Sequence, residues 1–174
     1  MRTNTSATTA TTAGKTVMRP TRNPINAGAR EALAGMLNTR LADSIDLRLQ
    51  VKQAHWNMQG PSFIALHELY DQIADSVNNA VDDIAERIVQ LGGVAAGSLQ
   101  QAASNTTLDA YPNPDQWKEH VEAVAKALAA VSAACVETIN AAEEHDDPIT
   151  ADLFTRIGGE IDKHLWMVES HLQG

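Results

Sequence analysis

The sequence predicts an all-α protein built as a four-helix bundle, and both its composition and its apolar periodicity lead to this class. Ala and Leu are abundant, aromatic residues make up only 4% of the 174 residues, and runs of strand-forming residues are scarce. Apolar residues recur at spacings of three and four through four long stretches, which is the pattern of helices with one buried face. A hydrophobic share of 44% is enough for one domain with its own core.

The first 25 residues differ in composition from the rest and are predicted to form a disordered basic arm, which leaves residues 26–174 as the helical domain. The arm is mainly Thr, Ala, Ser and Asn, which bury too little apolar surface to offset the entropy lost on ordering. Residues 1–30 contain five basic and no acidic residues, whereas residues 31–174 contain 8 basic and 22 acidic residues. A transit peptide is the alternative for this start, although it has no amphipathic apolar stripe.

The first two long helices are predicted over residues 27–58 and 63–91. Between them, Gly60, Pro61 and Ser62 form a break, and Pro61 or Ser62 suits the start of a new helix. Such a short turn makes the two helices antiparallel neighbours. Their apolar stripes contain Leu33, Leu37, Leu41, Ile45, Leu49 and Met58 in the first helix and Ile64, Leu66, Leu69, Ile73, Val77, Val81, Ile84, Ile88 and Leu91 in the second.

A second pair of helices is predicted over residues 115–144 and 149–172. It follows a connection of 22 residues with at most one short helix, near residues 98–103. A connection this long is uncommon in a compact domain, and here it can run back along the bundle from the far end of the second helix. Two hairpins joined by one long crossover is the plan of ferritin-like four-helix bundles, so we expect that architecture.

The composition also limits where the protein works and what it binds. The single cysteine, Cys135, falls in a helical apolar stripe, so we expect a buried thiol in a reducing compartment. No apolar run reaches the roughly 18 residues that cross a bilayer, and the start lacks the apolar stretch of a secretory signal. We therefore expect a cytoplasmic protein without a membrane partner. The net charge of −9 argues against nucleic acid binding over the whole surface.

Four polar residues of the second helix form two pairs at a spacing of four residues: His67 with Asp71, and Asp82 with Glu86. Each pair shares a helix face, and all four residues lie on one broad stripe because eleven residues are about three turns. The pairs are about 16 Å apart along the axis, too far for one metal ion within a chain. The four positions are, however, symmetric about the midpoint of the stripe. If two copies of this helix pack antiparallel across a two-fold axis, His67 comes opposite Glu86 of the partner subunit, and Asp71 opposite Asp82 of the partner subunit.

His55 completes this pattern. It lies six residues before the proline of the turn and His67 lies six residues after it, so the hairpin brings the two imidazoles side by side. The predicted site is His55, His67 and Asp71 of one chain with Asp82 and Glu86 of the other. Mixed imidazole and carboxylate ligands suit Fe(II), Mn(II) or Zn(II). The alternative is that the histidines are hydrogen-bonded structural residues and the carboxylates form a solvated face.

The sequence around these residues resembles the Dps family, the miniferritins named as DNA-binding proteins from starved cells. The segments that carry the resemblance are KQAHWNMQGPSFIALHELYD, DDIAERIVQLGG, TADLF and DKHLWMVES, and the similarity extends over about residues 30–172. The resemblance implies that His55, His67 and Asp71 bind iron together with Asp82 and Glu86 of the two-fold partner. It also implies a hollow shell of twelve subunits. There Fe(II) is oxidised, usually by hydrogen peroxide rather than oxygen, and stored as ferric mineral, which protects DNA from oxidative damage.

Two further groups of residues are interpreted through this resemblance. Trp56 resembles the family tryptophan near the metal centre, although a packing role at an interface explains it equally well. Four acidic residues near the last turn are candidates for an acidic route of iron uptake, and a solvated charged turn explains them as well. They are Glu143, Glu144, Asp146 and Asp147.

Non-specific DNA binding through residues 1–30 is a second functional expectation. Some members of the family bind duplex DNA through basic tails, and many arms on one particle would add avidity through phosphate contacts. The acidic body opposes this, and the arm has no dense lysine cluster. The alternative function is a structural particle that compacts DNA and whose metal site is structural. A di-iron or manganese enzyme with its metal inside one bundle is disfavoured, because no Glu-x-x-His motif occurs.

Overall fold

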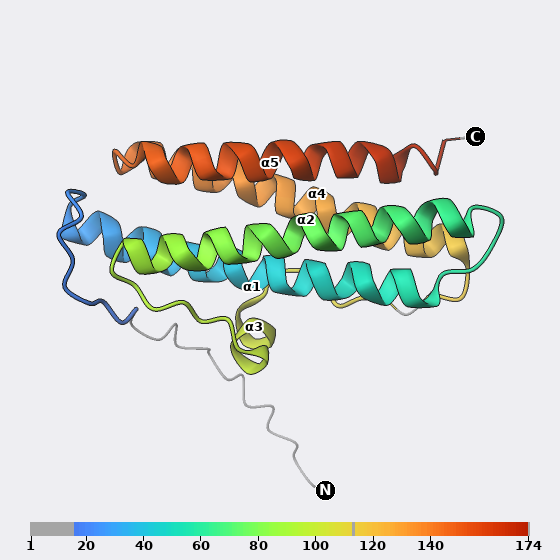
Figure 1. Cartoon of the computed structure of the whole chain (residues 1–174), viewed down its shortest axis with the longest axis horizontal. Helices are drawn as coiled ribbons and strands as arrows, with labels where there is room; N and C mark the ends of the chain where they lie inside the picture. The colour runs from blue at the N-terminus through green and yellow to red at the C-terminus, as the bar shows by residue number, and fades with distance from the viewer. Residues whose placement is uncertain (1–15, 113, 174) are drawn as a thin grey trace, which may run out of the picture.

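The structure is a computed structural model, and it describes residues 16–112 and 114–173. Within these ranges the secondary structure is entirely helical, which confirms the predicted class (Figure 1). Among the described residues, no helix is both long enough and apolar enough to span a membrane. The helices are α1 (Ala27–Asn57), α2 (Phe63–Gln90), α3 (Leu99–Asn105), α4 (Trp117–Glu144) and α5 (Pro148–Glu169).

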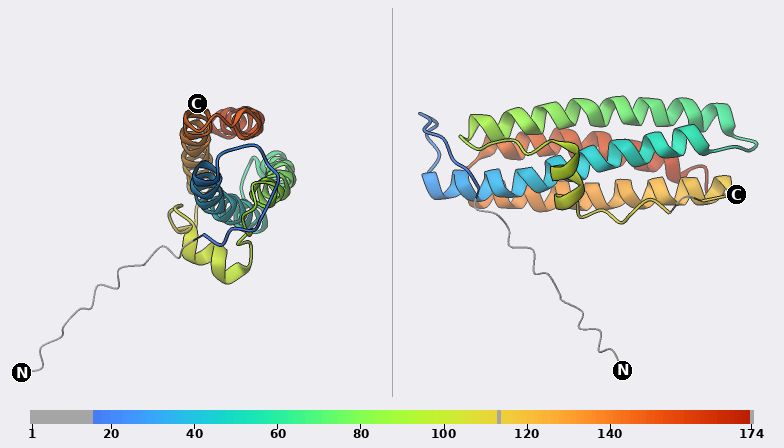
Figure 2. Two further views of the ribbon diagram at one scale, coloured as in Figure 1. Left: turned by 90° about the vertical axis from the view of Figure 1, so that its left-hand side faces the viewer. Right: turned by 90° about the horizontal axis from the view of Figure 1, so that it is seen from below.

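The four long helices form a bundle that is clearest in the end-on view (Figure 2), in which α2 and α4 run in the same direction because a long crossover connects them. Helix α1 packs against α2 and α4, and α5 packs against α4 and α2, so the order around the bundle is α1, α2, α5, α4. After α2 the chain runs back along the outside of α1, carrying α3 with it (Figure 1). This is the predicted long crossover with its short helix.

The helix boundaries follow local capping chemistry. Helix α1 starts after Asn26, whose side chain accepts a hydrogen bond from the Gly28 N–H at 2.9 Å. Helix α3 starts with a capping box between Ser98 and Gln101. Helix α4 begins at Trp117, two residues later than predicted, because Gln116 makes the corresponding box at its start.

Helix α5 differs slightly from its predicted range of 149–172. It begins at Pro148, which suits the first helical position because its ring fixes φ, and it ends at Glu169. The preceding Asp147 caps it by accepting a hydrogen bond from the Thr150 N–H at 3.0 Å. The cap also fixes the direction in which α5 leaves the turn.

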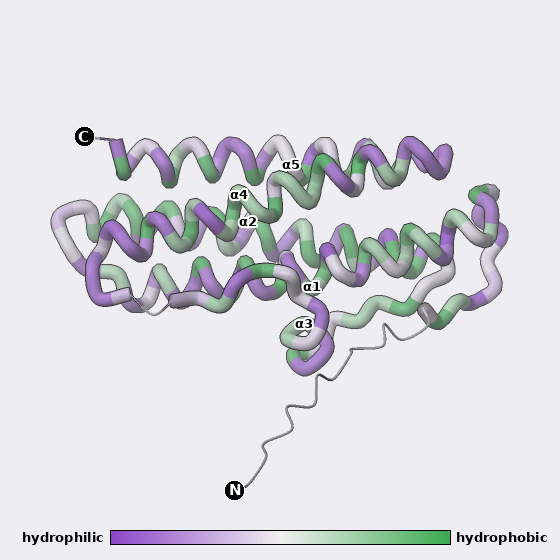
Figure 3. The backbone as a smooth tube through the Cα atoms, turned by 180° about the vertical axis from the view of Figure 1, so that it is seen from behind, coloured by the Kyte–Doolittle hydropathy of each residue, from purple (hydrophilic) through white to green (hydrophobic). Residues whose placement is uncertain are grey.

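The core lies between the four long helices. Figure 3 shows hydrophobic and hydrophilic residues alternating along each helix, as expected for helices that bury one face. The largest fully buried side chains are Tyr70, Phe154, Leu33, Leu37, Leu41, Leu47, Met58, Leu66, Ile73, Ile84, Ile88 and Leu91. Cys135 is also buried, as predicted, and burial raises the pKa of its thiol to about 12.

Residues 16–25 belong to the segment predicted to be a disordered arm, but the structure places them against the bundle. Met18 and Ile25 pack on the core, and the Arg19 N–H donates to the Gly92 carbonyl at 2.6 Å. Gly92 has a φ of +91°, and a side chain there would meet the Arg19 carbonyl oxygen. The expectation of disorder therefore fails for residues 16–25, because two apolar side chains and the end of α2 hold them. Residues 1–15 lie outside the described residues.

Candidate metal centre

His55 and His67 face each other across the α1–α2 hairpin. Their rings are stacked, with centroids 3.7 Å apart and planes 20° apart. Each ring also hydrogen-bonds the other residue's backbone: His55 Nδ1 donates to the His67 carbonyl at 2.9 Å, and His67 Nδ1 donates to the His55 carbonyl at 3.0 Å. The short turn therefore brings the two imidazoles together, as their spacing from it predicted.

These reciprocal hydrogen bonds determine which ring nitrogens are free. A carbonyl oxygen only accepts, so each Nδ1 must carry a proton. In the neutral ring each Nε2 then keeps its lone pair, which is the form that binds a metal ion. Because His55 is buried and both rings are fixed at Nδ1, the two Nε2 atoms are oriented before any ion arrives.

Asp71 lies one turn beyond His67 on α2, and its Oδ1 is 3.5 Å from His55 Nδ1. The same oxygen lies 2.5 Å from Nζ of Lys52, one turn before His55 on α1. The hydrogen bond from Lys52 is the main cause that lowers the pKa of Asp71, with smaller contributions from the two histidines. Asp71 is therefore ionised and already paired with a cation that belongs to the protein.

Lys52 was not among the predicted site residues. The sequence carried a signal for it, because Lys52 precedes His55 by three residues and so shares its helix face. We call His55, His67, Asp71 and Lys52 the built half-site. Within one chain it offers two imidazole nitrogens and one carboxylate, with an ammonium group competing for the carboxylate.

Asp82 and Glu86 contrast with the built half-site, and we call them the open half-site. Both are exposed on α2, and neither side chain has a hydrogen bond or ion pair with another described residue. Across residues 16–112 and 114–173, no three His, Cys, Asp or Glu side chains are grouped closely enough to hold a metal ion. The structure thus stacks His55 on His67 and places Asp71 Oδ1 3.5 Å from His55 Nδ1 without closing a three-ligand group, and it leaves Asp82 and Glu86 about 16 Å or more further along α2.

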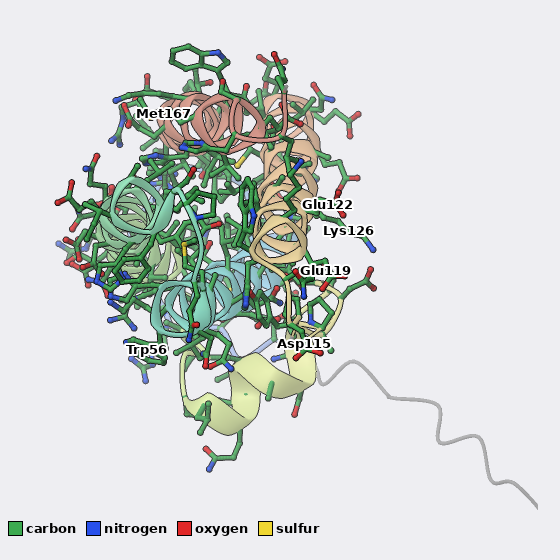
Figure 4. All side chains as sticks on the ribbon, turned by 90° about the vertical axis from the view of Figure 1, so that its right-hand side faces the viewer. Trp56, Asp115, Glu119, Glu122, Lys126 and Met167 are labelled. Atoms are coloured by element: carbon green, nitrogen blue, oxygen red, sulfur yellow. The ribbon has the colours of Figure 1, made fainter. Side chains whose placement is uncertain are left out.

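Trp56 lies on the outer side of α1, away from α4 and α5 (Figure 4). It is 64% exposed, unusually high for a tryptophan, and Lys52 Nζ is 5.6 Å from the centroid of its ring. Lys52 therefore links Trp56 to Asp71. Exposed Ile64 at the start of α2 adds to the apolar surface near the turn.

Asp147 is not available as part of an iron uptake route. It is fully buried, and both of its carboxylate oxygens accept from Arg87 Nη2, at 2.7 and 2.8 Å. Arg87 Nε also donates to the Thr150 hydroxyl at 2.9 Å. The cluster joins the end of α2 to the start of α5, so the proposed role of Asp147 was wrong and its role is structural. The other three candidates, Glu143, Glu144 and Asp146, are exposed, and their role stays a prediction.

Comparisons with known proteins agree with this architecture. Residues 34–174 match the family described as Ferritin, ferritin-like domain. The chain is 45% identical over 155 residues to the DNA protection during starvation protein of Agrobacterium fabrum, covering 88% of this chain and 95% of the relative. It is 32% identical over 142 residues to the protein of the same name from Mycolicibacterium smegmatis, covering 81% and 77%.

Solved structures give the same result. DpsA14 from Streptomyces coelicolor superposes with a TM-score of 0.85 at 33% identity, covering 90% of this chain and 95% of that one. DpsC from the same organism gives a TM-score of 0.87 at 26% identity and covers 97% of each chain. Sequence and fold are therefore shared over nearly the whole domain, and the chain belongs to the Dps family of ferritin-like proteins.

Proposed function

We propose that this protein oxidises Fe(II), with hydrogen peroxide as the oxidant, at sites shared between two subunits, and that it stores the ferric product inside a hollow shell. The observation that carries the proposal is the division of the polar stripe on α2. At one end His67 faces His55 of α1, and both imidazoles have fixed Nδ1 protons. At the other end Asp82 and Glu86 are exposed and have no partner among the described residues. A two-fold axis through the middle of α2 would bring the two ends together.

The donor set suits both oxidation states of iron. Neutral imidazole nitrogens bind Fe(II) well, and three carboxylates stabilise the harder Fe(III) ion, so the set favours the oxidised product. Two Fe(II) ions deliver two electrons to one peroxide, and with two protons the products are two Fe(III) ions and two water molecules. Supplying both electrons together avoids hydroxyl radical, which is how such a protein would protect DNA.

The exposed apolar residues near the turn support an interface on this side of the bundle. Trp56 and Ile64 are 64% and 61% exposed in the single chain, and large apolar side chains that cluster at this level of exposure often mark a protein interface. We propose that a second copy of the chain covers them when it completes the two sites. A closed shell, twelve subunits by resemblance to the family, would then provide the storage space in the cytoplasm.

The test is anaerobic loading of the assembled protein with Fe(II), followed by stoichiometric peroxide, with ferric absorbance and spin-trapped hydroxyl radical both recorded. The wild type should oxidise iron quickly and release little radical. A His55→Ala, His67→Ala variant should lose the fast phase while keeping its particle size. A His145→Ala, His171→Ala variant removes two imidazoles elsewhere and should behave as the wild type. Equal slow oxidation in all three proteins would contradict the proposal.

DNA binding remains a second prediction for this chain. Arg19 and Arg22 are exposed at the end of the bundle, although the segment that carries them packs against α2. Gel retardation at low salt, with full-length particles and an Arg19→Gln, Arg22→Gln variant that also lacks residues 1–15, tests whether the basic start of the chain contributes. Equal retardation of DNA by both particles would argue against it.

A further inference from the structure

A second pair of polar residues lies where the crossover meets α4, and the proposed chemistry does not use it. The hydroxyl of Tyr111, in the crossover, lies 2.5 Å from Nδ1 of His120 on α4. His120 is buried, and Tyr111 is half-buried and packs on the core. A phenol in such close contact with a buried imidazole is poised to exchange a proton with it.

The partners of His120 determine the direction of that exchange. Its ring also hydrogen-bonds the backbone of Pro114, and a proline has no N–H, so the ring must donate to the Pro114 carbonyl. In the neutral ring Nδ1 is then the acceptor, and the Tyr111 hydroxyl donates to it. Burial lowers the pKa of His120, which keeps the ring neutral and able to accept. His120 Nδ1 is therefore a base that can accept the phenolic proton of Tyr111 directly.

The pair lies at the same end of the bundle as the built half-site. Trp117, at the start of α4, packs against the α1–α2 turn, where a side chain at Gly60 would be 3.0 Å from its ring. His120 is one turn further along α4, and α4 is a direct neighbour of α1. Tyr111 is also close enough to Tyr70, which precedes Asp71 on α2, to raise the pKa of Tyr70.

Tyr70 provides a comparison within the same region. It is completely buried, and its hydroxyl has no hydrogen-bond partner among the described residues. Burial, and after it the proximity of Tyr111, raises the pKa of Tyr70. The chain contains two tyrosines, so one has a base for its proton and the other has none. Loss of an electron makes a phenol strongly acidic, and only Tyr111 can release its proton without leaving a charged radical in the core.

We propose that Tyr111 and His120 form a redox-active pair that supplies the second electron to peroxide when the metal centre holds a single Fe(II) ion. This inference rests on the proposed function. One Fe(II) gives one electron and becomes Fe(III), and the Tyr111 phenol gives the other. Its proton moves to His120 Nδ1, and two protons from solvent complete the reduction of one peroxide to two water molecules. The products at the pair are a neutral tyrosyl radical and an imidazolium ion.

A later Fe(II) ion restores the pair. It reduces the tyrosyl radical, the proton returns from His120 to the phenol oxygen, and a second Fe(III) is formed. The total is again two Fe(II) oxidised for each peroxide, so the pair changes only the order of the two electron transfers. Its benefit appears when iron is scarce, because a one-electron reduction of peroxide would otherwise release hydroxyl radical.

The experiment uses the assembled full-length protein, loaded anaerobically with less than one Fe(II) per chain and mixed with stoichiometric peroxide. Samples are frozen within the first turnover and recorded by electron paramagnetic resonance. A tyrosyl signal is expected that narrows when the protein contains ring-deuterated tyrosine. Tyr111→Phe should abolish it, and the matched variant Tyr70→Phe should retain it. His120→Gln keeps the phenol but removes the base, and should lose most of the signal.

Spin trapping gives a second readout. Tyr111→Phe should release severalfold more hydroxyl radical than the wild type below one Fe(II) per site, and equal amounts when iron is in excess. Fast ferric formation without a tyrosyl signal, or a signal that persists in Tyr111→Phe, would overturn the inference and leave the proposed function intact. Absence of fast ferric formation in the wild type would instead overturn the proposed function, and the inference with it.

Discussion

The two ends of the polar stripe on α2 both contain metal-binding types of side chain, but they are organised very differently. In the built half-site, His55 and His67 hold each other through two hydrogen bonds, and Asp71 is paired with Lys52. In the open half-site, Asp82 and Glu86 project from α2 without a described partner. The chain therefore fixes the imidazoles by itself, whereas the two carboxylates are exposed, and we propose that a partner subunit uses them.

The stretch of α2 that carries the open half-site is nevertheless anchored to the bundle by Arg87. Glu86 is exposed, whereas the next residue, Arg87, is buried and bonded to Asp147 and Thr150. Adjacent positions of one helix thus differ in their surroundings: Glu86 is exposed, and Arg87 anchors the helix in the bundle. The comparison suggests that ligand residues and anchoring residues can be altered separately.

The largest expected effect is on the rate of iron oxidation, when a chain with a defective built half-site and a chain with a defective open half-site are combined in one particle. A His55→Ala, His67→Ala chain and an Asp82→Ala, Glu86→Ala chain should each be inactive alone. In a mixed dimer, one site carries both defects and the other carries none. With random pairing half of the dimers are mixed, so oxidation should recover to about a quarter of the wild-type rate.

Co-expression with two affinity tags gives the mixed particles for this rate measurement. Particles mixed after folding, without exchange of subunits, are the control and should stay inactive. If co-assembled particles were also inactive, the ligands would not be shared between chains, and the division into a built and an open half-site would lose its functional meaning.

The next largest expected effect is on stability, when the ion pair between Arg87 and Asp147 is removed. Arg87→Met leaves the Asp147 carboxylate buried and unpaired, which typically costs about 3–5 kcal/mol of the free energy of unfolding. Denaturant titration measures this loss, with Glu86→Gln as the control at the adjacent exposed position. A loss of less than about 1 kcal/mol in Arg87→Met would show that the ion pair does not anchor α2.

The same ion pair predicts how stability depends on pH. Burial by itself would raise the pKa of Asp147, but hydrogen bonds from Arg87 and Thr150 outweigh burial and lower it. The ionised group therefore stabilises the fold above the ordinary carboxyl range, and this contribution is lost as the pH falls through the lowered pKa. Acid titration of unfolding should show a weaker pH dependence in Asp147→Asn than in the wild type.

A smaller effect is expected on the affinity of the built half-site for Fe(II). Lys52→Met removes the ammonium group that competes with a metal ion for Asp71, so the affinity for the first Fe(II) should rise about tenfold, or roughly 1.4 kcal/mol. Anaerobic calorimetry measures it, and Lys52→Arg, which keeps the charge, should bind no more tightly than the wild type. Unchanged affinity in Lys52→Met would mean that Lys52 moves aside without cost.

The smallest expected effect is the change in the stability of the protein when the two carboxylates of the open half-site are replaced. Asp82→Asn and Glu86→Gln remove charges that have no described partner, so the free energy of unfolding should change by less than about 0.5 kcal/mol. Thermal unfolding of the assembled particles measures this change. A large loss of stability would reveal that these carboxylates already hold the subunits together without metal.

Much of the fold could be predicted because helix periodicity and helix breaks are local properties. The apolar stripe of α2 and the Gly60 to Ser62 break placed the hairpin within a residue or two. The side-by-side imidazoles followed from their equal distance to that break. The capping of α4 by Gln116 was missed because an ordinary glutamine is a weak signal for a helix start.

The sequence by itself determined which residues share a helix face, because an α-helix has a fixed period of about 3.6 residues. The fold class, the hairpin and the symmetric register of His67, Asp71, Asp82 and Glu86 all follow from that period. Only the tertiary structure decided how segments far apart in the chain meet. It oriented the Nδ1 protons of the histidines, placed Lys52 on Asp71, buried Asp147 against Arg87 and set Tyr111 on His120. These contacts depend on helix packing and on the path of the crossover, which no local spacing rule contains.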